Sequence, residues 1–161
     1  MADVPKPFPT PIGLRLNQTA RAVERAFDKA LAEAGGTLPT WLILLNLKIG
    51  KPGTQKSLAE EIGIREATLT HHLNAMDARG LITRTRDAAN RRVQIVTLTE
   101  AGEAAFLRLR TAAQAFDARL GDGLAEADLA TLATLLARLS VNVGACAEPV
   151  RPWAGPPERA T

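Results

Sequence analysis

Residues 65–99 contain the side chains in this chain that are best suited to recognising a ligand. Thr68 and His71 lie three residues apart, and the arginines further downstream include those at positions 84, 86, 91 and 92. Hydroxyl and imidazole groups can hydrogen-bond to base edges, whereas guanidinium groups pair with phosphates. These residue types therefore indicate contact with DNA.

The sequence around these residues predicts a helix-turn-helix followed by a hairpin. One short helix begins after a cap at Thr54, and Gly63 supplies the turn. A second helix is expected over residues 65–79, with Leu69, Leu73 and Met76 as its buried stripe and Thr68, His71 and Ala75 facing outward. Strands are expected near residues 81–86 and 92–98, joined by the turn-prone residues 87–90. In such a unit the second helix enters the major groove and the hairpin reaches the minor groove.

The remaining helices are predicted from apolar residues at helical spacing and from glycine breaks. They cover residues 12–34, 40–49, 100–120 and 125–143, with Thr99 capping the helix that begins at residue 100. The expected fold is mainly α, with about six helices and a two-stranded β-wing. Residues 1–11 form a proline-rich arm, and residues 147–161 form a proline-rich tail. The amphipathic terminal helices either complete the core of one chain or pair with a second chain.

Positive charge is concentrated in the segment predicted to bind DNA. Residues 48–92 carry nine Lys and Arg against five Asp and Glu, whereas residues 93–161 carry six against eight. The excess lies where phosphates would be met, although a solvated basic face alone would give the same balance.

Several classes of protein find little support in the sequence. No run of about 18 apolar residues indicates a membrane span, and the N-terminus lacks the apolar core of a signal peptide. A single cysteine, Cys146, excludes an intrachain disulfide, so we expect a cytoplasmic protein. No nucleophile–base pair, phosphate loop or metal cluster indicates an enzyme, and we expect no cofactor.

His71 and His72 do not form a convincing metal site, and Cys146 does not form a convincing redox site. Adjacent helical residues point about 100° apart, so the two histidines cannot chelate one ion together. Cys146 has no cationic neighbour in sequence that would lower its pKa, which favours a packing role.

The order of these segments resembles the MarR family of winged-helix transcription regulators. The resemblance covers residues 12–145 and is carried by SLAEEIGI, ATLTHHLNAMDARGLITR, DAANRRVQIV and LTEAGE. It implies a homodimer joined through residues 12–34 and 100–146, with residues 37–99 as the DNA-binding lobe. Family members usually repress transcription, and many release DNA when a small aromatic or phenolic ligand binds. A two-fold dimer in turn predicts a pseudo-palindromic operator.

The resemblance also implies roles for individual residues. The family's wing-tip arginine corresponds to Arg92, with Arg91 as the alternative because Asn90 replaces the aspartate that often orients this arginine. The further DNA-contacting positions are Thr54, Glu66, Thr68, Thr70 and His71. Arg84 and Arg86 can contact phosphate from the first wing strand, although exposed strand arginines without a role are equally common.

A pocket for an aromatic effector would lie, by the same resemblance, between the dimerisation helices and the DNA-binding lobe. Asn17, Trp41 and His72 are its candidate lining residues. Trp41 is also well placed to be a simple core residue, and His72 to be a hydrogen-bonded residue beneath the recognition helix. The leading hypothesis is a ligand-responsive repressor, and the alternative is a constitutive DNA-binding accessory protein without an effector.

Overall fold

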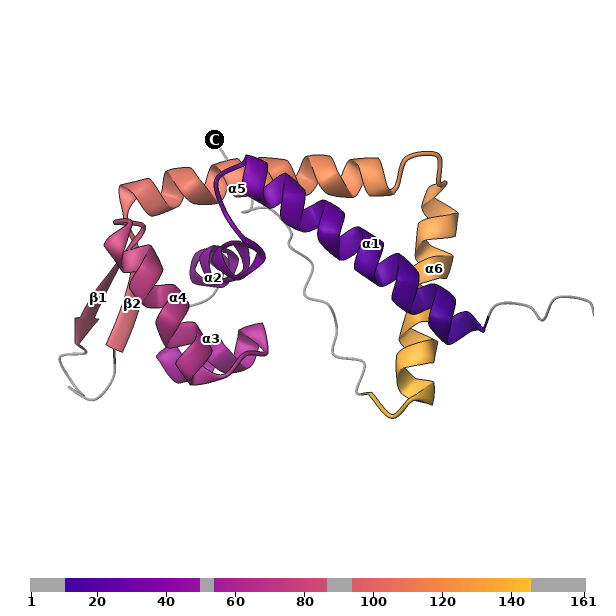
Figure 1. Ribbon diagram of the computed structural model, residues 1–161, viewed down its shortest axis with the longest axis horizontal. Coiled ribbons are helices and arrows are strands. Elements are labelled where there is room, and N and C mark those ends of the chain that lie inside the picture. The colour runs from indigo at the N-terminus through magenta and orange to yellow at the C-terminus, as the bar shows by residue number, and fades with distance from the viewer. Residues whose placement is uncertain (1–10, 50–53, 87–93, 146–161) are drawn as a thin grey trace, which may run out of the picture.

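The computed structural model describes residues 11–49, 54–86 and 94–145 of the chain. Within them lie six helices and one two-stranded sheet (Figure 1). The helices are α1 (Ile12–Glu33), α2 (Leu38–Ile49), α3 (Gln55–Ile62), α4 (Glu66–Ala78), α5 (Glu100–Leu120) and α6 (Glu126–Asn142), and the strands are β1 (Ile82–Arg86) and β2 (Gln94–Leu98). The predicted mainly α fold with a β-wing is confirmed, and the element ends differ from prediction by one or two residues.

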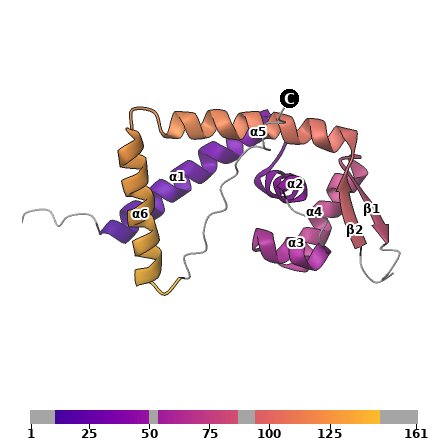
Figure 2. The ribbon, with the colours of Figure 1, turned by 180° about the vertical axis from the view of Figure 1, so that it is seen from behind.

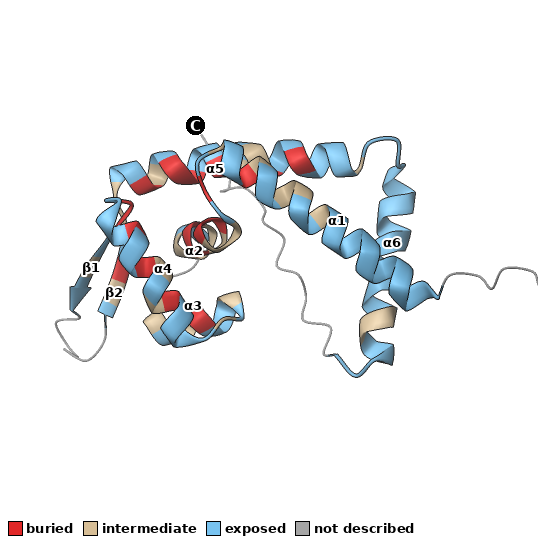
Figure 3. Ribbon diagram, in the orientation of Figure 1, coloured by how far each residue is buried: buried red, intermediate tan, exposed pale blue. Residues whose placement is uncertain are grey.

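The hydrophobic core lies in a lobe formed by α2, α3, α4, the sheet and the first half of α5. The apolar helix α2 is at its centre, with Ile43 and Leu44 fully buried. The predicted stripe of α4 is confirmed, because Leu69, Leu73 and Met76 are all buried. Figure 3 shows the buried residues gathered in this lobe and along the side of α5 that faces it. The surface predicted to bind DNA thus rests on a packed support.

Polar caps and one close backbone contact define how the elements of the lobe join. Thr54 and Thr99 cap α3 and α5, each accepting a hydrogen bond from a backbone N–H three residues later. Gly63 adopts the predicted left-handed conformation at a φ of 76°. At Gly102, a Cβ atom would lie 2.0 Å from the carbonyl oxygen of Leu81, so only glycine allows α5 to approach the start of the wing.

The wing is an antiparallel ribbon whose register runs from Ile82 opposite Leu98 to Arg86 opposite Gln94. Ile82 and Val96 are buried on the side that faces the helices. Thr83 and Thr97 lie on the outer side, where their hydroxyl groups hydrogen-bond at 2.8 Å. The alternation of side chains therefore places Arg84 and Arg86 on the face that also carries Ile82.

The helices α1 and α6 extend away from the lobe, as Figures 1 and 2 both show. The C-terminal part of α1 packs on α5, with the rings of Phe27 and Phe116 4.9 Å apart, and Leu31 is its one buried residue. No residue of α6 is buried. This settles one alternative left open by the sequence, because α6 does not complete the core of a single chain.

Candidate nucleic-acid interface

The outer face of α4 carries the polar side chains that the sequence placed there. Thr68 and His71 are exposed on the sides of the helix that point away from the buried stripe, and Glu66 is exposed at the N-terminal end. Glu66 is in the first turn of the helix, where its carboxylate matches the positive end of the helix dipole. The face thus offers a carboxylate, a hydroxyl and an imidazole, which together can donate and accept hydrogen bonds.

Thr70 differs from its neighbours because its hydroxyl is already engaged inside the protein. It donates to the carbonyl oxygen of Glu66 at 2.8 Å and accepts from Nε2 of Gln55 at 2.5 Å. The side chain is half-buried between α3 and α4. A threonine hydroxyl has a single proton, so Thr70 has no donor left to offer to a base.

The two arginines of β1 occupy different environments. Arg86 is exposed at the end of the strand. Arg84 is half-buried, and its Nε and Nη2 atoms are covered without a hydrogen-bond acceptor among the described residues. Arg86 can therefore meet a phosphate directly, whereas most of the guanidinium of Arg84 is turned toward the protein. Asn90, Arg91 and Arg92 lie outside the described residues.

Thr54 connects the helix-turn-helix to the wing. Its side chain caps α3, and its backbone forms an isolated antiparallel bridge with Ile95 of β2. The residue is exposed at the N-terminus of α3, where the unsatisfied N–H groups of a helix favour anions. This position suits a phosphate contact and also ties α3 to β2.

The three residues predicted for an effector pocket have different surroundings. Trp41 is buried in the core, and its ring stacks on Phe106 with centroids 5.8 Å apart. Asn17 is exposed on α1, and His72 is half-buried on α4 with its ring 5.8 Å from that of His71. The structure therefore supports the core interpretation of Trp41.

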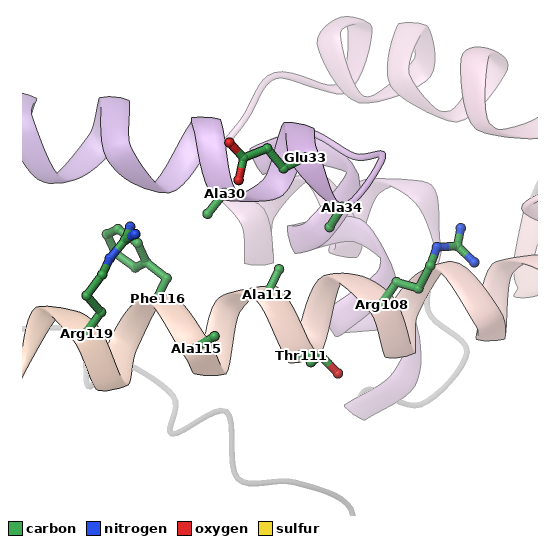
Figure 4. Close-up of a pocket in the computed structure, with 9 residues that line it drawn as sticks. All are labelled: Ala30, Glu33, Ala34, Arg108, Thr111, Ala112, Ala115, Phe116 and Arg119. Atoms are coloured by element: carbon green, nitrogen blue, oxygen red, sulfur yellow. The ribbon is translucent and has the colours of Figure 1, made fainter.

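A groove of about 380 Å³ lies between α1 and α5. Figure 4 shows alanines from both helices at its centre, with Arg108 toward one end and Arg119 toward the other. Phe116 contributes an aromatic ring, and the guanidinium carbon of Arg119 lies 5.6 Å from the centre of that ring. Glu33 adds one carboxylate to the lining. The groove combines an apolar surface with cationic ends.

The comparisons with known proteins agree with this architecture. The MarR family model matches residues 37–93, the segment that contains α2, the helix-turn-helix and β1. Over this segment the chain is similar to the MarR family. The solved structure of the transcriptional repressor CouR bound to a 23-mer DNA duplex is similar, with 27% identity and a TM-score of 0.73 over 81% of this chain and 92% of that chain.

Two further solved structures are similar over most of their length. A probable transcriptional regulator from Pseudomonas aeruginosa is 29% identical with a TM-score of 0.70, and the match covers 81% of this chain and 97% of that one. The M. tuberculosis transcriptional regulator MOSR in complex with DNA is 25% identical with a TM-score of 0.65, covering 84% of this chain and 97% of that one.

The described residues offer neither a metal site nor a membrane span. No group of three or more His, Cys, Asp or Glu side chains is arranged to hold a metal ion within residues 11–49, 54–86 and 94–145. In the same ranges, no helix is both long enough and apolar enough to cross a bilayer.

Sequence reasoning missed two features of this chain. Gln55 has no signal in a single sequence, since a glutamine at the start of a helix is usually solvated. Its contact with Thr70 joins residues 15 positions apart and depends on the angle between α3 and α4. The groove between α1 and α5 was missed because its residues come from helices at opposite ends of the domain.

Proposed function

We propose that this protein is a MarR-family transcription regulator that binds double-stranded DNA as a homodimer. The observation that carries the proposal is the exposed polar face of α4, held beside a wing that ends in the exposed Arg86. In this arrangement Thr68 and His71 read base edges in the major groove, and Glu66 accepts a hydrogen bond from an exposed base amino group. The arginines of the wing, including Arg91 and Arg92, contact phosphates and the adjacent minor groove.

The homodimer is supported by the apolar surface that one chain leaves uncovered. Leu129, Leu132 and Leu136 on α6 each expose about two fifths of their surface or more, and Ile12 and Leu16 on α1 are also exposed. A groove of about 290 Å³ lies between the start of α1 and the end of α6. Exposed apolar surface of this extent marks an interface. A two-fold dimer would place two copies of α4 on half-sites about 10 base pairs apart.

We also propose that the regulator is a repressor and that a small aromatic acid releases it from DNA. The groove between α1 and α5 supports this, because Phe116 offers a ring surface and Arg108 and Arg119 offer cations for a carboxylate. A ligand in this groove contacts both α1 and α5. The first half of α5 belongs to the lobe, whereas α1 extends away from it. The ligand changes DNA affinity only by its preference for one of the two conformations.

Selection of bound duplexes from a random pool tests the DNA-binding proposal. The expected product is a pseudo-palindrome whose affinity exceeds that of scrambled DNA by about a thousandfold or more. Binding without sequence preference would favour the alternative of a constitutive accessory protein that coats DNA.

Titration of the selected complex with a panel of aromatic acids tests the effector. An acid that releases the wild-type protein from the operator should need an at least severalfold higher concentration to release Arg119→Gln. Arg138→Gln is the control, because Arg138 is exposed on α6 away from the groove, and it should respond as the wild type does. A panel without any effect on operator affinity would support the constitutive alternative.

A further inference from the structure

A hydrogen bond between Gln55 and Thr70 links the two helices of the helix-turn-helix. Nε2 of Gln55, the first residue of α3, donates to Oγ1 of Thr70 across 2.5 Å. Both side chains are half-buried, so this hydrogen bond is partly shielded from competing water. Thr70 in turn donates to the carbonyl oxygen of Glu66 in the first turn of α4.

The same polar chain continues to the wing. Gln55 directly follows Thr54, whose backbone bridges to Ile95 of β2. One connected line of hydrogen bonds and backbone therefore joins β2, the start of α3 and the first turn of α4. These are the elements that must meet adjacent grooves of one duplex at the same time.

The apolar contacts of α4 still allow the helix to rotate slightly about its long axis. The hydrogen bond between Gln55 and Thr70 can prevent this rotation. The helix is 13 residues long and is anchored by a single stripe of three buried side chains. Small rotations about that stripe would shift Thr68 and His71 relative to the base edges while keeping the stripe buried. A polar contact on the flank of the helix opposes such rotation, because its geometry tolerates little displacement.

We infer that Gln55 is a positioning residue that acts through Thr70 to hold the first turn of α4 in the orientation needed for sequence readout. This inference rests on the proposed DNA-binding function. It also reassigns Thr70, which the family resemblance placed among the DNA contacts, to a role inside the protein. Gln55 should therefore affect the discrimination between operator and other DNA more than it affects binding to phosphates.

The test compares Gln55→Ala, Thr70→Val and the double variant on operator and scrambled duplexes at several salt concentrations. Loss of one hydrogen bond should lower operator affinity by about three- to tenfold in either single variant. Scrambled-DNA affinity and the salt slope should stay unchanged. The double variant should be no more than about threefold weaker than the weaker single variant, because both changes remove the same contact.

Two control variants separate positioning from direct contact. Thr70→Ser keeps the hydroxyl and should bind within about twofold of the wild type. Lys56→Ala, at the exposed neighbour of Gln55, should weaken operator and scrambled DNA alike and reduce the salt slope by about one unit. If Gln55→Ala behaves like Lys56→Ala while Thr70→Val has no effect, Gln55 is a direct phosphate contact and the inference is overturned.

A measurement without DNA keeps the inference distinct from the proposed function. The amide of Leu69 donates to the carbonyl of Arg65 at the start of α4. Its hydrogen exchange should accelerate in Gln55→Ala and Thr70→Val but not in Lys56→Ala, with the dimer and the unfolding midpoint retained. Unchanged exchange in both single variants would refute the positioning role even if the chain binds its operator, whereas a wild-type chain without operator preference would refute the proposed function alone.

Discussion

Individual side chains divide into those that face a ligand and those that hold the lobe together. The outward positions of Thr68, His71 and Ala75 followed from the sequence, because the period of the buried stripe turns these residues away from the core. The engagement of Thr70 could not be predicted, since it depends on the reach of Gln55 from another helix. The sequence therefore predicts which residues of α4 are exposed, but it does not predict which side chains of other helices contact them.

Replacement of His71 and of Arg86 should have different effects on DNA binding. His71→Ala should change which base is preferred at one operator position by about 1–3 kcal/mol, because an imidazole hydrogen-bonds to a base edge. Arg86→Ala should weaken operator and scrambled DNA alike and lower the salt slope by about one unit. The affinities of both variants for a set of operators that differ at single bases test this. If His71→Ala loses the same affinity for every operator in the set, His71 contacts a phosphate instead of a base.

Gly102 is required by the distance between α5 and the start of the wing. A Cβ atom in Gly102→Ala would meet the carbonyl of Leu81, so the backbone must shift, and we expect a loss of about 1–3 kcal/mol in the free energy of unfolding. Gly121→Ala is the matched control, since its Cβ atom would lie 3.6 Å from the nearest atom and should change stability by less than about 0.5 kcal/mol. Urea unfolding measures both, and equal midpoints would contradict the steric argument.

At the scale of elements, the order and the ends of the helices were largely predictable from caps and glycines. Thr54, Gly63 and Thr99 mark boundaries by local hydrogen bonds or backbone conformation, which a sequence displays directly. The way in which the elements pack on one another was harder to predict from the sequence. For example, α5 had been expected to act in dimerisation, yet it also supplies Phe106 and Leu109 to the core of the lobe.

The junction between the wing and α5 depends on the side chain of Thr99. Its hydroxyl donates to the carbonyl of Gly80 at 2.6 Å and accepts from the amide of Gly102 at 3.0 Å. Thr99→Val keeps the shape but removes both hydrogen bonds, and it should lower the free energy of unfolding by about 1–2 kcal/mol. Thr99→Ser should retain most of the stability in thermal unfolding, and a loss as large as that of Thr99→Val would point to the methyl group instead.

At the scale of the whole molecule, the uncovered leucines of α6 connect the fold to the assembly. Leu136→Glu places a charge within this stripe and should convert the proposed dimer to a monomer at micromolar concentration, because burying an unpaired carboxylate is strongly unfavourable. Thr134→Glu lies on the opposite side of α6 by helical spacing and should remain a dimer. Light scattering distinguishes the two, and dimeric Leu136→Glu would exclude this face from the interface.

The proposed function requires two copies of α4 to engage one duplex through symmetric half-sites. The mass of the complex on the selected operator, combined with a footprint of the protected bases, tests this claim most directly. We predict two chains per duplex and two protected half-sites centred about 10 base pairs apart. A single chain per duplex, or protection without two-fold symmetry, would contradict it.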